Sequence, residues 1–148
     1  MTATTRQRLL WLVGAALGAV FLVAGLYKIV APADFAQEIA NYRFLPELAP
    51  YLAGTLPGVE IVLGLALVVA PLPWRRAAAL AATGVMLAFT VAVMQALARG
   101  IDIACGCFGQ GSASISGLTV LRNVTLLIAA IIVMEPGRAK NAPERPLP

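Results

Sequence analysis

The sequence predicts an all-α integral membrane protein, a four-helix transmembrane bundle with a short helix at the outer interface. Hydrophobic residues make up 60% of the 148 residues and charged residues only 12%, and the mean hydropathy is +0.86. These values lie outside the range of soluble domains. Four segments approach the roughly 20 apolar residues that a membrane-crossing helix needs: residues 9–31, 48–70, 77–98 and 117–134. Short connections between them favour one up-down bundle over residues 1–134, with no second domain.

The first span, residues 9–31, is expected to be a retained helix. Arg6 and Arg8 precede it, and the Ala-Pro-Ala run at 31–33 faintly resembles a cleavage site, so a cleaved signal peptide is the alternative. The apolar run is about twice the length of a signal-peptide core. The later spans also commit the chain to the membrane, and both points favour the retained helix.

The connection after the first span is expected to hold the interfacial helix. Residues 32–50 are too polar and too rich in proline to cross a bilayer, but residues 33–42 can form an amphipathic helix that lies at the interface and covers the outer end of the bundle. An apolar stripe supports this interpretation: Phe35, Ile39, Tyr42, Phe44 and Leu45.

The second span, residues 48–70, is expected to pack closely on the first. The two spans carry glycines at 14, 18 and 25 and at 54 and 58, and small residues let helices approach closely in lipid. Pro57 removes a backbone hydrogen bond. The helix is therefore expected either to kink there or to begin afresh with Thr55 as its N-cap.

The distribution of basic residues predicts the orientation of the bundle. Cytoplasmic flanks of membrane spans carry an excess of Lys and Arg, which places both termini in the cytoplasm and the loop between the third and fourth spans outside. Residues 135–148 hold four prolines and are expected to form a disordered cytoplasmic tail. The net charge of +4 does not indicate nucleic-acid binding, because the basic residues are scattered at span ends: Arg6, Arg8, Arg75, Arg76, Arg138, Lys140 and Arg145.

The loop between the third and fourth spans holds the two cysteines of the chain, Cys105 and Cys107, on either side of Gly106. Glycine tolerates the sharp turn that a bond between such close cysteines requires, and a strained disulfide is easily reduced, as a redox-active bond must be. A structural disulfide here would close too small a loop to stabilise the fold much. Two thiolates can also hold Cu(I), but no methionine lies beside them. The sequence has no histidine, and no metal site is expected.

Polar residues inside the spans are costly and mark functional sites by default. If the topology holds, most of them gather in the outer half of the bundle, on the side of the cysteines. Glu60 must be neutral or paired at its depth, so an interior ion pair with Lys28 is expected. For Lys28 and Arg122, extension to the headgroups is the alternative. These residues are Lys28, Glu60, Gln95, Arg122 and Asn123.

Three roles follow for these polar residues. Arg122 is the candidate group that lowers the pKa of a cysteine thiol, because a nearby cation favours the thiolate. Glu60 can carry protons released when thiols are oxidised. Gln95 is expected to form a hydrogen bond across helices.

Several segments together resemble the MauE branch of the DoxX-like membrane proteins. The Asp102-Ile-Ala-Cys-Gly-Cys-Phe-Gly109 block and the following Leu121-Arg122-Asn123 are the most specific part of the likeness, which also includes the stretch from Gly18 to Lys28 and Leu56-Pro57-Gly58-Val59-Glu60. The resemblance implies a bacterial inner-membrane protein that supports periplasmic disulfide formation. In methylamine utilisation, it implies maturation of a disulfide-rich dehydrogenase subunit alongside a thioredoxin-like partner.

The family is also similar to the redox bundles of the DsbB and vitamin K epoxide reductase type, which pass electrons between thiols and a quinone. Those proteins use two cysteine pairs, whereas this chain has one. We therefore predict a thiol-disulfide oxidoreductase in which Cys105 and Cys107 exchange electrons with a thioredoxin-like protein, with Cys107 favoured as the attacking residue. The candidate acceptor is a quinone in the outer half of the bundle, near Glu60 and Arg122. Asp102, Gly106 and Phe108 are expected to support the pair, as are Gln95 and Asn123. A non-catalytic assembly factor and a Cu(I)-binding protein are the alternatives, and a homodimer is a candidate assembly in the bilayer.

Overall fold

The structure, a computed structural model, describes residues 3–43, 46–101 and 116–134, and in these ranges every regular element is helical. The elements are α1 (Ala3–Val30), α2 (Pro32–Asn41), the 3-10 helix η1 (Pro46–Leu48), α3 (Ala49–Val69), α4 (Leu72–Ala98) and α5 (Gly117–Met134). By length and composition α1, α3, α4 and α5 can each cross a membrane. The predicted all-α membrane fold is therefore confirmed. The cysteine loop and the predicted tail lie outside the described residues.

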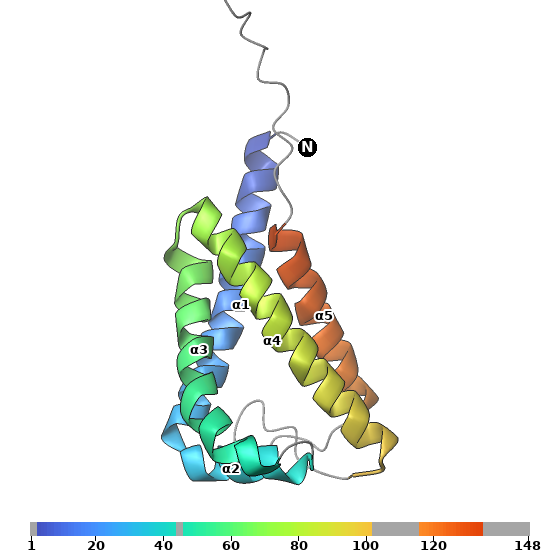
Figure 1. Ribbon diagram of the computed structural model, residues 1–148. Coiled ribbons are helices and arrows are strands. Elements are labelled where there is room, and N and C mark those ends of the chain that lie inside the picture. Colours follow the sequence, from blue (N-terminus) through green and yellow to red (C-terminus); the bar gives the residue numbers. More distant parts are fainter. Residues whose placement is uncertain (1–2, 44–45, 102–115, 135–148) are drawn as a thin grey trace, which may run out of the picture.

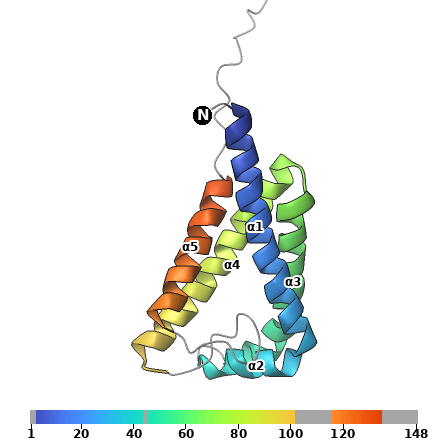
Figure 2. The same ribbon diagram turned by 180° about the vertical axis from the view of Figure 1, so that it is seen from behind.

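The four long helices form two pairs. Helix α1 packs most extensively on α3, and α4 on α5, while weaker contacts join α3 to α4 and α1 to α5. The pairs converge at one end and diverge toward the other, where α2 lies across the bundle (Figures 1 and 2). The two termini of the described chain lie at the convergent end.

The hydrophobic core fills the convergent end. All four long helices contribute to it, and the largest fully buried side chains there belong to Leu17, Phe21 and Leu67. Large apolar side chains on the outer faces are exposed, including Val30, Val69 and Leu118, as expected where the surrounding medium is lipid.

Helix α2 closes the divergent end. It spans nearly the predicted residues, and its Phe35 is buried. Tyr42, which follows it, packs with Val93 and Ala96 of α4. Arg99 at the end of α4 donates a hydrogen bond to the carbonyl oxygen of Arg43 at 3.2 Å. The predicted short helix after the first span is thus present, and the chain that follows it is hydrogen-bonded to the end of α4.

Two expectations for α3 are wrong. The helix does not begin afresh at Thr55: it continues through Pro57, and the Thr55 hydroxyl donates to the carbonyl oxygen of Tyr51 at 2.8 Å within the helix. Gly54 and Gly58 have open space where a Cβ would lie; the α3 glycine that meets α1 is Gly64. The buried positions of α3 recur every three or four residues, so Gly54 and Gly58 fall one position away from the face that contacts α1: Ala49, Ala53, Pro57, Glu60, Leu63, Gly64 and Leu67.

The third span begins earlier than predicted. Helix α4 starts at Leu72 rather than at residue 77, with a proline in its first turn, where proline is well tolerated. Arg75 and Arg76 therefore lie in the helix and not in a loop, and both are half-buried. Arg75 donates to the carbonyl oxygen of Ala70 at 3.0 Å, which shows how a basic residue can be accommodated in this turn.

Candidate functional site

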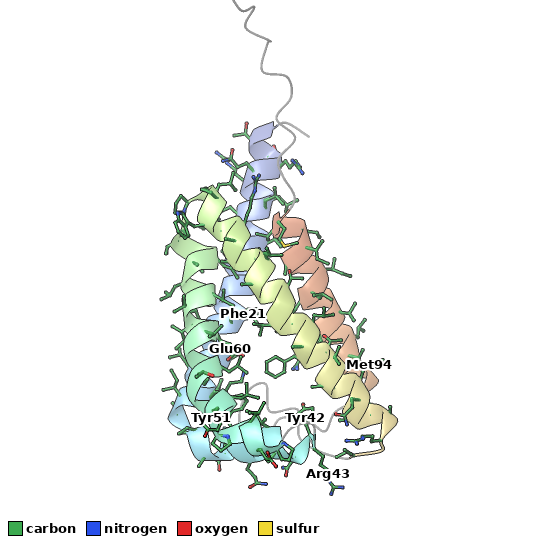
Figure 3. All side chains as sticks on the ribbon, viewed as in Figure 1. Phe21, Tyr42, Arg43, Tyr51, Glu60 and Met94 are labelled. Atoms are coloured by element: carbon green, nitrogen blue, oxygen red, sulfur yellow. The ribbon has the colours of Figure 1, made fainter. Side chains whose placement is uncertain are left out.

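A buried ion pair joins α1 to α3. Lys28 donates a hydrogen bond to Oε1 of Glu60, and each side chain is only 3% exposed. Figure 3 shows Glu60 directed from α3 toward the interior of the bundle. The predicted pair is confirmed, and the alternative in which Lys28 extends to the headgroups is wrong.

Gly25 explains how the two charged side chains meet. It lies one turn before Lys28, and a Cβ built on it would be 3.0 Å from the carbonyl oxygen of Pro57 and 3.3 Å from Cβ of Glu60. A side chain at this position would push the helices apart. Glycine therefore lets the α1 backbone lie against α3 at the level of the ion pair.

Two aromatic rings complete the environment of the ammonium group. Lys28 Nζ lies 5.0 Å from the ring centroid of Phe35 on α2 and 5.1 Å from that of Phe89 on α4. Both distances are within the range of cation–π attraction. Lys28 of α1 thus interacts with one side chain on each of α2, α3 and α4.

A small cavity of about 30 Å³ lies beside the ion pair. All four long helices line it, and its polar lining comes from Lys28, Glu60, Arg122 and Asn123; the apolar remainder is Val20, Ala24, Met86, Phe89 and Leu126. The structure therefore brings together four of the polar residues that the sequence marked as candidates. Asn123 is buried and Arg122 is half-buried.

Gln95 lies away from this group. It does not line the cavity, and neither atom of its buried amide has a hydrogen-bond partner among the described residues. The expected bond across helices is therefore not found in the described part of the chain.

The segment that carries the cysteines starts and ends near this site. Residues 102–115, which include Asp102, Cys105, Gly106, Cys107 and Phe108, lie outside the described residues. Ile101, directly before them, packs on the cluster around Tyr42, and so does Val120 in the first turn of α5. The described ends of this connection thus lie at the α2 end of the bundle (Figure 1).

The sequence did not single out Phe89 as part of the site. Its inward position follows from the face of α4 that also carries Met86, Val93 and Ala96. This face is not readable from hydropathy, because α4 is apolar on its lipid side as well. Phe89 could have been identified by its helical spacing of three or four residues from an inward-facing residue such as Met86 or Val93.

Comparison with known proteins assigns this architecture to a family. The family model described as "Methylamine utilisation protein MauE" matches residues 6–134. The chain belongs to the MauE family. A curated member, the methylamine utilization protein MauE of Paracoccus denitrificans, is 37% identical over 127 residues, which cover 84% of this chain and 67% of that protein. No solved structure shows detectable similarity. MauE membership and the four apolar helices support a multi-pass bacterial membrane protein.

Proposed function

We propose that this protein is a membrane thiol-disulfide oxidoreductase that exchanges electrons between Cys105 and Cys107 and a periplasmic thioredoxin-like protein. It supports disulfide formation in exported proteins, in particular a disulfide-rich protein of methylamine utilisation. The observation that carries the proposal is the group of Lys28, Glu60, Arg122 and Asn123 around one cavity, toward the end of the bundle where the described ends of the cysteine segment lie. The protein resides in the bacterial inner membrane with both termini in the cytoplasm, so that this end faces the periplasm.

The chemistry is two successive thiol-disulfide exchanges. A thiolate of the partner attacks the Cys105–Cys107 disulfide, which forms a mixed disulfide and releases one cysteine as a thiolate. The partner's second thiolate then attacks the mixed disulfide and releases the other cysteine. The partner loses two electrons and becomes a disulfide, and the chain gains both electrons as a dithiol. The reverse sequence reduces the partner.

A quinone is the proposed final acceptor of these electrons. The described cavity does not fit it, because about 30 Å³ is far below the roughly 150 Å³ that holds a single benzene ring in a protein core. An acceptor quinone would therefore meet the cysteines outside this cavity, from the lipid. Its addition to the purified, reduced protein should convert the two thiols to a disulfide, measured by maleimide labelling. Thiols that stay reduced would remove the quinone from the proposal.

Single replacements of the cysteines test the central claim. In membranes that contain Cys105→Ser or Cys107→Ser, we expect one variant to accumulate a covalent adduct with a thioredoxin-fold protein, sensitive to dithiothreitol and identified by mass spectrometry. The double variant should form none. Single variants that form no adduct and still support client maturation would indicate a non-catalytic assembly factor instead. Copper retained by the purified wild type but not by the double variant would indicate a Cu(I) site.

A further inference from the structure

Two buried side-chain atoms, one on α3 and one on α5, lack hydrogen-bond partners among the described residues. Oε2 of Glu60 on α3 and Nδ2 of Asn123 on α5 form no hydrogen bond with any described residue, although the two residues are only 2% and 3% exposed. Leaving such groups unpaired is costly, and native proteins usually satisfy them through ordered water. Both residues line the same cavity.

The volume of the cavity limits what can satisfy these atoms. A buried water needs about 10–15 Å³ of such space, so about 30 Å³ suits one or two water molecules and excludes an organic ligand. The lining is mostly apolar, and the side chains of Val20, Ala24 and Leu126 in it offer no hydrogen bond to water. A water held there would therefore be oriented by the polar groups alone.

We infer that this cavity is a hydrated proton-transfer site, in which water bridges Asn123 and Glu60 and the Glu60 carboxylate accepts a proton. The amide Nδ2 of Asn123 donates to the water oxygen, and the water donates to Oε2 of Glu60. Lys28 already occupies Oε1, which leaves Oε2 as the atom that takes the proton. This site is independent of the cysteines in its geometry, but its proposed use depends on the function proposed above.

Thiol-disulfide exchange requires proton transfers, which this site can carry out. A cysteine thiol must lose a proton to become a thiolate, and the thiolate released later must gain one. In each of the two exchanges, the proton of the attacking partner thiol passes through water to Oε2 of Glu60, which becomes a neutral carboxylic acid, and then passes to the cysteine thiolate that the attack releases. No net proton or electron is left on Glu60 after one cycle.

The charged groups around Glu60 are few. Lys28 approaches it from α1 and Arg122 lines the cavity from α5, whereas α4 contributes Met86 and Phe89. Among the described lining residues, Glu60 is the sole acid. The Glu60→Gln variant is therefore the control that assigns a carboxylic-acid signal from this cavity.

Infrared difference spectroscopy on the full-length protein in lipid nanodiscs tests the inference without reference to cysteine chemistry. Lowering the pH should produce a carbonyl band of a protonated carboxylic acid that shifts in D₂O and is absent in Glu60→Gln. In Asn123→Leu, which removes the amide at similar volume, the band should shift in frequency and its deuterium exchange should slow at least about tenfold, the factor that corresponds to about 1.4 kcal/mol in a barrier. Gln95→Leu removes a buried amide outside the cavity and should leave both quantities unchanged.

The outcomes separate the two proposals. If Asn123→Leu leaves the frequency and exchange rate of the Glu60 band as in wild type, or if wild type shows no such band, the hydrated site is wrong. The same samples, mixed with a reduced dithiol, report the proposed use: the band should appear while the exchange proceeds and be absent once Cys105 and Cys107 are fully reduced. Suppose that the Glu60 band titrates with pH but maleimide labelling shows that the cysteines are redox-inert. That result would contradict the oxidoreductase proposal and would still support the hydrated site.

Discussion

The α1–α3 pair and the α4–α5 pair are held together by different contacts. Where α1 meets α3 the backbones touch: a Cβ added to Gly18 would lie 2.7 Å from the carbonyl oxygen of Gly64, and one added to Gly64 would lie 2.8 Å from that of Gly18. In the other pair, Gly84 and Gly117 have open space around them. That pair packs through side chains, so its spacing is set by their volume.

The two pairs also contribute different chemistry to the cavity. The buried ion pair of Lys28 and Glu60 belongs wholly to α1 and α3, while α4 and α5 supply Phe89, Arg122 and Asn123. The cysteine segment connects α4 to α5. The two buried charges of the ion pair thus lie on the glycine-packed pair, and residues of both pairs line the cavity.

Breaking the ion pair should have the largest effect on the glycine-packed pair. Lys28→Met leaves the Glu60 carboxylate buried without its partner, and Glu60→Leu does the same to Lys28, so each should lower the free energy of unfolding by about 3–5 kcal/mol. The double variant should recover most of this loss, because no buried charge remains. Thermal unfolding in detergent measures all three. A double variant as unstable as the sum of the single variants would show that the two charges are not coupled in the folded state and would contradict the ion pair.

Filling the helix contact is expected to have the next largest effect. Gly18→Val places a side chain against the Gly64 carbonyl oxygen, which cannot move without separating the helices, so we expect a loss of about 3 kcal/mol. Gly84→Val on α4 is the matched control, because nothing lies within 4 Å of the added Cβ; it should change stability by no more than about 0.5 kcal/mol. Equal losses in the two variants would contradict the difference between the pairs.

Removing one aromatic ring should have a smaller effect and should weaken the link between the pairs. Phe89→Leu keeps an apolar side chain but removes the ring that lies 5.1 Å from Lys28 Nζ, and a desolvated cation–π contact contributes about 2 kcal/mol. In a Lys28→Met background the same change should cost less, since no cation is left to attract. The difference between the two costs, measured as a double-mutant cycle, isolates the contact. A coupling energy near zero would mean that the ring acts by packing alone.

Much of this architecture could be predicted from the sequence, and the reasons differ by feature. Hydropathy located the four spans, and the amphipathic stripe around Phe35 located α2. The ion pair was predictable because Glu60 is the one acidic residue within the spans and requires a partner. The choice of Gly64 over Gly54 and Gly58 was not predictable, because helices that are apolar on all sides do not reveal which face turns inward. The start of α4 was missed for a local reason, the tolerance of its first turn for proline and arginine.

The smallest expected effect comes from Gln95, a residue of α4 whose buried amide contributes no hydrogen bond between the described helices. Both of its polar atoms lack a hydrogen-bond partner among the described residues, so the folded state bears their desolvation cost with no compensating bond. Gln95→Leu keeps a similar volume and should raise the free energy of unfolding by about 1 kcal/mol, measured by the midpoint of thermal unfolding beside wild type. A loss of stability would instead reveal that the amide is hydrogen-bonded in the membrane, which would make α4 a polar contributor to this end of the bundle and would narrow the contrast between the two helix pairs.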